Sequence, residues 1–259
     1  MADEIKKVGG AQTLEKGLLT LEYVVENKTV SLTKLAKQMG INKSTLYRYL
    51  STLKRMGYLS QDENDGYFLT DKLMKMAMGV VPQMEIRTVA LEYLTGLANQ
   101  TEYNSNLGFW NGKEILYLAQ KRPHPIGPFM VGETIPAYCS ALGKAILAFL
   151  PEQEVEEYVA KTRFKTFTPA TTASPEQLRA ELAGVREQGY AVMNGEMLTG
   201  LVGVAVPIFI SGTTPKYALS LAGSLYGDVR QFADQCVPLL QMAAKAIADR
   251  VEQHNNMYA

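Results

Sequence analysis

The stretch SLTKLAKQMGINKSTLYRYLSTLKRMGY, residues 31–58, is typical of two short helices joined by a tight turn. Ser31 can cap the first helix, whose apolar residues recur at helical spacing. Gly40 stands where many helices end in a left-handed residue, and Asn42 can cap the second helix. Two helices joined by a short turn that contains glycine predict a helix-turn-helix.

The second helix has two chemically different faces when its residues are placed about 100° apart. Leucines occupy one face, and hydroxyl and cationic side chains occupy the other. Arginine can recognise guanine in the major groove, while hydroxyls and lysines suit phosphates. An ordinary solvated helix face is the alternative interpretation. Together with two residues of the preceding helix, the predicted DNA contacts are Thr33, Lys34, Lys43, Ser44, Thr45, Tyr47, Arg48, Ser51 and Arg55.

The charge of the chain is unevenly distributed, although its formal net charge is zero. Residues 27–61 contain seven lysines and arginines and no acid, whereas the rest of the chain has a net charge of −7. A basic block in an otherwise acidic protein is the pattern expected of a module that binds a polyanion. The sequence therefore favours nucleic acid as a partner.

The residues around the helix-turn-helix complete a winged domain. Thr13 can cap an earlier helix that runs to about Asn27, with apolar residues at helical spacing, and residues 27–30 read as a connection. After the second helix, a strand, a polar turn at Gly66 and a second strand predict a wing. Residues 1–70 are thus predicted to form a winged helix-turn-helix DNA-binding domain.

The segment DKLMKMAMGVV, residues 71–81, has helical propensity and too many apolar residues for a single buried face. A methionine-rich exposed helix is a candidate dimer contact, although it could also pack against the wing. We therefore expect residues 71–84 to form a linker and dimerisation helix.

Residues 85–259 predict an α+β domain with a mostly antiparallel sheet. Asn111-Gly112 between two β-like runs is a strong hairpin signal. The loop from Lys121 to Pro136 is expected to carry binding residues. The predicted helices are 85–100, 140–150, 152–161, 175–188 and 228–253, and the predicted strands are 103–110, 113–120, 190–193, 201–210 and 217–222.

The sequence argues against an enzyme, a membrane protein and a metalloprotein. Residues 1–10 lack the apolar core of a secretory signal and no apolar run reaches about 18 residues, so neither a leader nor a membrane span is expected. The two cysteines suit a reducing cytoplasm. The two histidines, His124 and His254, have no partner at metal-ligand spacing, so no metal or cofactor is expected. Ser140 and Lys144 lie one helical turn apart, but we do not expect a catalytic pair.

Four blocks resemble the IclR (isocitrate-lyase regulator) family in order and spacing. They are LTKLAKQMGINKSTLYRYLSTLKRMGYL, IPAYCSALGKAILAFLP, FTPAT and REQGYAVMNGEMLTGLVGVAVPIF. The resemblance implies a GAF-like effector domain behind the winged helix, and homodimers or dimers of dimers on double-stranded operator DNA. It also implies regulation, as repressor or activator of catabolic genes, by a small organic or aromatic acid.

The resemblance also implies the residues of an effector pocket. Gly203 stands where many relatives have cysteine, Ala222 where serine is frequent, and Met193 where aspartate occurs. These departures suggest a larger, less polar pocket and a partly apolar effector such as an aromatic carboxylate. The implied effector residues are Met130, Ala141, Leu142, Met193, Asn194, Leu201, Gly203, Ser220 and Ala222.

Two alternatives to a ligand-responsive regulator remain at this point. One is an enzyme tethered to DNA, which the lack of a catalytic constellation argues against. The other is a constitutive DNA-binding protein whose second domain is structural and does not sense a ligand.

Overall fold

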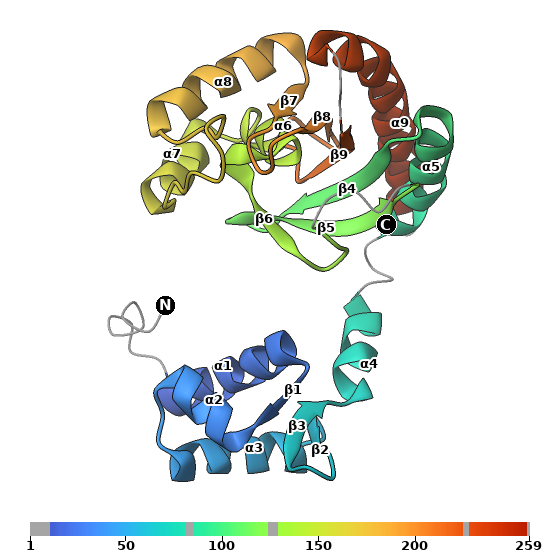
Figure 1. Ribbon diagram of the computed structural model, residues 1–259. Helices are drawn as coiled ribbons and strands as arrows, with labels where there is room; N and C mark the ends of the chain where they lie inside the picture. The colour runs from blue at the N-terminus through green and yellow to red at the C-terminus, as the bar shows by residue number, and fades with distance from the viewer. Residues whose placement is uncertain (1–10, 81–84, 124–128, 225–227, 258–259) are drawn as a thin grey trace. The chain divides into compact units, whose positions relative to one another are not determined.

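The computed structural model describes residues 11–80, 85–123, 129–224 and 228–257 (Figure 1). The chain divides into two compact units, residues 1–83 and 84–259, and each is described by itself. His124 and part of the expected binding loop lie outside the described residues. None of the helices in the described ranges is both long and apolar enough to cross a membrane.

The first unit is a winged helix-turn-helix. Its strands form an antiparallel sheet in the order β1-β3-β2. Strand β1, which pairs Val30 with Tyr67, replaces the connection expected at residues 27–30, because three residues are too few to show a strand pattern. Its elements are α1 Gln12–Asn27, β1 Thr29–Ser31, α2 Leu32–Met39, α3 Lys43–Arg55, β2 Leu59–Gln61, β3 Gly66–Leu69 and α4 Asp71–Val80.

The predicted signals at the central turn are confirmed. The Ser31 hydroxyl accepts a hydrogen bond from the Lys34 amide at 3.4 Å, and the Asn42 side chain accepts one from the Thr45 amide at 2.8 Å. Gly40 ends α2 with a left-handed φ of 63°. These caps satisfy amides that the helices leave unpaired, so the two helices begin where the sequence places them.

Helix α1 differs from expectation in its cap and in the face that it buries. It begins at Gln12 after Ala11, so the prediction that Thr13 is the cap is wrong. Val24 and Thr20 are the residues that α1 buries. Thr20 tolerates burial because its hydroxyl donates to the carbonyl of Lys16 at 2.7 Å. A stripe of apolar side chains on α1 is consequently left exposed: Leu14, Leu18 and Val25.

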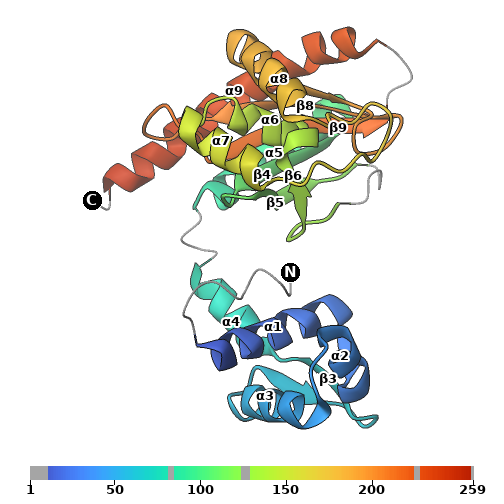
Figure 2. The same ribbon diagram turned by 90° about the vertical axis from the view of Figure 1, so that its left-hand side faces the viewer.

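The second unit is a six-stranded antiparallel sheet in the order β6-β5-β4-β9-β8-β7. The sheet carries α5 and α9 on one face and α6, α7 and α8 on the other (Figures 1 and 2). The short strand β6 was not predicted, since it lies in a proline-rich loop. Its elements are α5 Glu85–Thr101, β4 Asn104–Trp110, β5 Glu114–Lys121, β6 Thr134–Pro136, α6 Ala141–Leu147, α7 Glu152–Lys161, α8 Pro175–Gln188, β7 Ala191–Asn194, β8 Leu201–Ile208, β9 Tyr217–Ser224 and α9 Val229–Met257.

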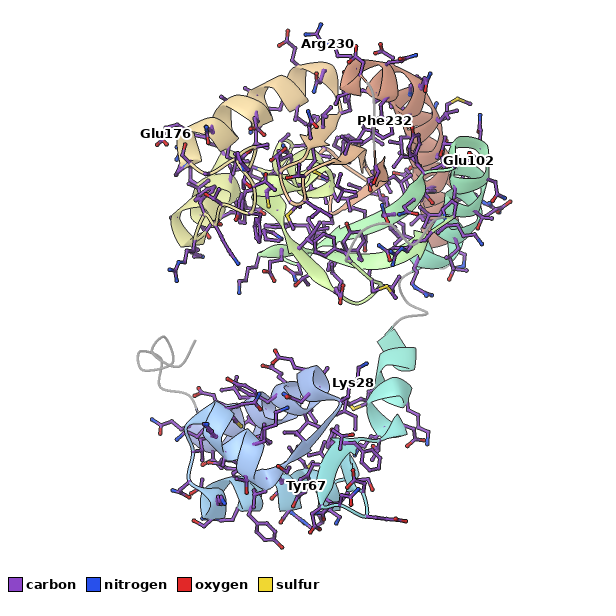
Figure 3. The ribbon with its side chains drawn as sticks, viewed as in Figure 1. Lys28, Tyr67, Glu102, Glu176, Arg230 and Phe232 are labelled. Carbon is purple, nitrogen blue, oxygen red and sulfur yellow. The ribbon has the colours of Figure 1, made fainter. Side chains whose placement is uncertain are left out.

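Each face of this sheet has its own apolar core. Alternate residues of the strands point to opposite faces, as the strand period requires. On the α9 face, Phe232 points toward the sheet and meets the Tyr103 ring edge-on, with the ring centroids 4.8 Å apart (Figure 3). On the other face, every residue of α6 is buried. The second core is therefore built around α6.

Strand β5 contains a β-bulge opposite β4. Leu107 pairs with Ala119 and Gly108 pairs with Tyr117, so Leu118 has no partner residue on β4. A bulge shifts the alternation of side chains by one residue. Tyr117 and Gln120 consequently share the sheet face that carries α6, which the regular period of two would not allow.

We predict that Gly143→Ala destabilises the second unit. A methyl group at Gly143 would lie 2.2–2.6 Å from backbone atoms of Ala137, which cannot move aside as a side chain can. The expected loss in unfolding free energy is about 1–3 kcal/mol or more, measured by chemical denaturation. Gly184→Ala in α8 is the control, because nothing lies within 4 Å of its added methyl. Equal stability of the two variants would contradict the close packing of α6.

Candidate DNA interface and effector cavity

Helix α3 buries Leu46 and Leu50 and exposes its opposite side. Thr45 and Ser51 on the predicted face are only half-buried. Tyr47 is 56% exposed, which is unusual for a large aromatic side chain without a covering partner. The exposed members of the predicted set on α3 are Lys43, Ser44, Tyr47, Arg48 and Arg55.

The cations of α3 are available to a polyanion. No ion pair involving Arg48 or Arg55 occurs within the described ranges. The Ser44 hydroxyl donates to the Asn42 side chain at 2.9 Å, which ties it to the helix cap. Thr33 and Lys34 are exposed in the first turn of α2. This surface presents positive charge without internal neutralisation, as contact with a phosphate backbone requires.

A small cavity of about 40 Å³ lies between α6 and the sheet of the second unit. It brings together seven of the nine implied effector residues: Ala141, Leu142, Met193, Leu201, Gly203, Ser220 and Ala222. Met130 is 55% exposed and is not among the residues that line the cavity. Asn194 is exposed and lines a separate open hollow beside Lys144 and Glu196.

The space that a glycine at position 203 opens is occupied by a methionine. A methyl group built on Gly203 would lie 3.7 Å from the terminal carbon of Met193, which is ordinary contact distance. The expected larger pocket is therefore filled by Met193 itself in this structure. Because a methionine side chain is flexible, a ligand could displace Met193 from this space.

The remaining wall of the cavity is mainly aromatic and apolar, and the sequence interpretation had not identified it. Tyr117 and Phe129 stack with their ring centroids 6.0 Å apart. Burial raises the pKa of the Tyr117 phenol, so this group stays protonated. Strand alternation from Ile115 could have placed Tyr117 on this face. The additional lining residues are Tyr117, Phe129, Ile135, Ser140 and Met197.

A buried ion network fixes α6 beside the cavity. The side chain of Lys144 is 3% exposed, and its Nζ lies 2.5 Å from Glu196 and 2.8 Å from Glu181. The Thr172 hydroxyl contacts both carboxylates, at 2.6 Å and 3.0 Å. Lys144 is thus held by carboxylates, and the Ser140 hydroxyl bonds to backbone groups at Ala137 and Gly143. The two side chains do not form a nucleophilic pair.

The loop that follows β7 is held by the same region. Thr168 donates to the carbonyl of Gly195 at 2.7 Å, and Thr171 donates to that of Glu196 at 2.7 Å. Met197 then reaches the cavity wall and contacts the buried Cys139. Burial, with the nearby Glu196 charge, raises the pKa of the Cys139 thiol to about 12, so it is not a nucleophile.

No group of three or more potential metal ligands occurs among the described residues. The second unit places an apolar cavity with hydroxyl groups next to a buried ion network. A wall of this composition is typical of small-molecule sites, although the cavity has room for only about one water molecule in this structure.

Comparison with known proteins identifies the family of each part of the chain. Residues 13–63 match the model of the IclR helix-turn-helix domain, and residues 78–249 match that of the bacterial transcriptional regulator IclR C-terminal domain. The HTH-type transcriptional regulator XynR of Escherichia coli is 36% identical over 215 residues, which cover 82% of this chain and 85% of XynR.

Solved structures show the same fold. The Thermotoga maritima IclR structure aligns with a TM-score of 0.73 at 28% identity, covering 93% of this chain and 99% of that one. An IclR homologue from Microbacterium hydrocarbonoxydans, solved in complex with 4-hydroxybenzoate, aligns with a TM-score of 0.78 at 23% identity, covering 90% and 98%. The matched domains span most of the chain, which therefore belongs to the IclR family of ligand-responsive, DNA-binding transcriptional regulators.

Proposed function

We propose that this regulator is controlled by a small organic acid, most suitably an aromatic one, bound in the cavity beside α6. The observation that carries the proposal is the composition of the cavity wall. Aromatic, methionine and small side chains surround the hydroxyls of Ser220 and Tyr117. Among the described residues, Ser220 only accepts a bond, from Asn106, and the Tyr117 hydroxyl makes none, whereas Ser140 both donates and accepts. An apolar body with a polar end suits this wall better than a small, highly charged acid.

The size of the cavity implies that it opens when the effector binds. About 40 Å³ is close to the volume of one water molecule, whereas a cavity of about 150 Å³ holds benzene. Met193, Met197 and Phe129 are the side chains that can move to make room. Effector binding therefore favours an open arrangement of these three side chains, and this difference between the free and bound protein is what a response can use.

The relative solved with 4-hydroxybenzoate is consistent with an aromatic acid. At 23% identity, the likeness to that relative shows a shared fold. The preference for an aromatic acid is inferred from the residues that line the cavity.

We further propose that the regulator acts in the cytoplasm as a homodimer or a dimer of dimers on double-stranded operator DNA. The exposed stripe Leu14, Leu18 and Val25 on α1 supports this, together with Met76, which is 51% exposed on α4. Contiguous exposed apolar side chains favour burial against a partner. The residues proposed to contact DNA remain Thr33, Lys34, Lys43, Ser44, Thr45, Tyr47, Arg48, Ser51 and Arg55.

Arg48→Ala is expected to weaken operator binding by about 1–3 kcal/mol and to relax base preference at one position per half-site. The reason is the loss of a guanidinium that can bond a base edge. Fluorescence anisotropy with operator variants measures both effects. Arg230→Ala, an exposed arginine of α9, is the control and should leave affinity unchanged. Unchanged affinity of Arg48→Ala would show that α3 is oriented differently on DNA.

Aromatic acids are expected to raise the melting temperature of the protein, while two- and three-carbon acids such as glyoxylate leave it unchanged. At a concentration 100 times its Kd, a ligand stabilises the folded state by about 2.7 kcal/mol. Gly203→Val should remove the effect, because branches beyond its Cβ meet Met193, and should leave DNA binding intact. If glyoxylate raises the melting temperature and aromatic acids do not, the effector is not an aromatic acid.

Leu14→Glu with Leu18→Glu is expected to weaken self-association and operator binding without unfolding the protein, because both side chains are exposed. Analytical ultracentrifugation measures the association. Gln12→Glu on the same helix is the charge control. Association and DNA binding that match this control would exclude α1 from the dimer contact.

A further inference from the structure

Three polar side chains form a continuous row across neighbouring strands β5, β4 and β9. Gln120 pairs with Asn106 in the register of β5 and β4, and Asn106 pairs with Ser220 in that of β4 and β9. Gln120 Nε2 lies 3.1 Å from Asn106 Oδ1, and Asn106 Nδ2 lies 3.0 Å from Ser220 Oγ. Ser220 then lines the effector cavity.

Two backbone carbonyls fix the direction of the hydrogen bonds in this row. Gln120 Nε2 also donates to the carbonyl of Phe129 at 3.3 Å, and Asn106 Nδ2 to that of Asn104 at 3.4 Å. Turning either amide over would place its oxygen against a carbonyl oxygen, which gives two acceptors and no donor. Donation therefore runs in one direction, from Gln120 to Asn106 to Ser220.

The end of the row determines what the Ser220 hydroxyl can do. Its oxygen accepts from Asn106, so its proton is directed elsewhere. Within the described part of the chain, we find no protein acceptor for that proton. Ser220 is only 3% exposed and lines the cavity, where a buried donor without an acceptor is unfavourable.

We propose that Asn106 and Gln120 are positioning residues that hold Ser220 as a hydrogen-bond donor, so that the regulator selects effectors with an acceptor oxygen at that point. A carboxylate or keto oxygen satisfies Ser220, whereas a protonated amine or an amidinium, which has donors only, does not. The inference rests on the proposed effector cavity and adds two residues that do not line it. The bulge at Leu118 is essential, because it brings Gln120 to the cavity face.

The test uses benzoate and benzamidine, two planar probes of the same shape that offer acceptors only and donors only. Isothermal titration with the full-length protein gives the ratio of their Kd values, and 4-hydroxybenzoate with 4-hydroxybenzamidine forms a second pair. In the wild type we expect benzoate to bind at least about tenfold more tightly, because a mismatched buried donor is strongly unfavourable.

A double-mutant cycle separates positioning from a structural role. Ser220→Ala and the uncharged change Asn106→Leu should each reduce the ratio, and Asn106→Leu should have no further effect in the Ser220→Ala background. Gln120→Leu is a second variant for the same cycle at a half-buried position. Ser105→Ala is the matched control, because this buried serine donates to the carbonyl of Leu94 on the opposite sheet face. It should lower stability and leave the ratio unchanged.

The outcomes distinguish this inference from the proposed function. A ratio that is unchanged in Asn106→Leu and Gln120→Leu, with benzoate bound by the wild type, overturns the positioning role and leaves the effector cavity standing. Equal binding of the two probes by the wild type overturns it as well. If neither these four probes nor the acids of the melting screen bind the wild type, the proposed effector function itself fails, and this inference with it.

Discussion

The buried charge of Lys144 is the constraint on which the effector unit depends. An ammonium group out of water is stable only when polar partners compensate its charge, and here Glu196 and Glu181 do so. The Thr172 hydroxyl in turn contacts both carboxylates. Removing one partner of such a buried pair typically costs 3–5 kcal/mol. The network therefore joins α6, α8 and the loop after β7 as one body. Of these elements, α6 supplies Ala141 and Leu142 to the cavity wall and the loop supplies Met197.

The side chains that fill the cavity are flexible, in contrast to the ion network. Close to the ion network, Met193 and Met197 occupy the space that a ligand would need. Because the ion network holds the backbone in place while these methionine side chains can move, a ligand can replace their contacts without unfolding the unit. Displacing these side chains would change the contacts of the cavity wall, and a local change of this kind is how a small molecule can influence a distant surface.

The winged domain could be predicted from sequence because its signals are local. Ser31, Gly40 and Asn42 each act within three or four residues, and the structure confirms all three. The face of α1 could not be assigned in this way, since Leu14 and Leu18 look like core residues until their neighbours are known. The predicted helices and main strands of the second unit were located by periodicity, but the short β1 and β6 gave no pattern to detect.

The family resemblance implied most of the residues that line the cavity, but the sequence did not indicate which side chains fill it. Gly203 suggested space, and only the structure shows Met193 occupying it. The polar row was hidden for a different reason: by alternation along β5, Tyr117 and Gln120 belong on opposite faces, and the unpaired Leu118 reverses this. A strand that lacked Leu118 would keep Tyr117 and Gln120 on one face by plain alternation, with Gln120 still opposite Asn106. The bulge thus absorbs one extra residue without breaking the polar row, so the length of β5 can change by one codon at this point while the cavity keeps its hydrogen-bond donor.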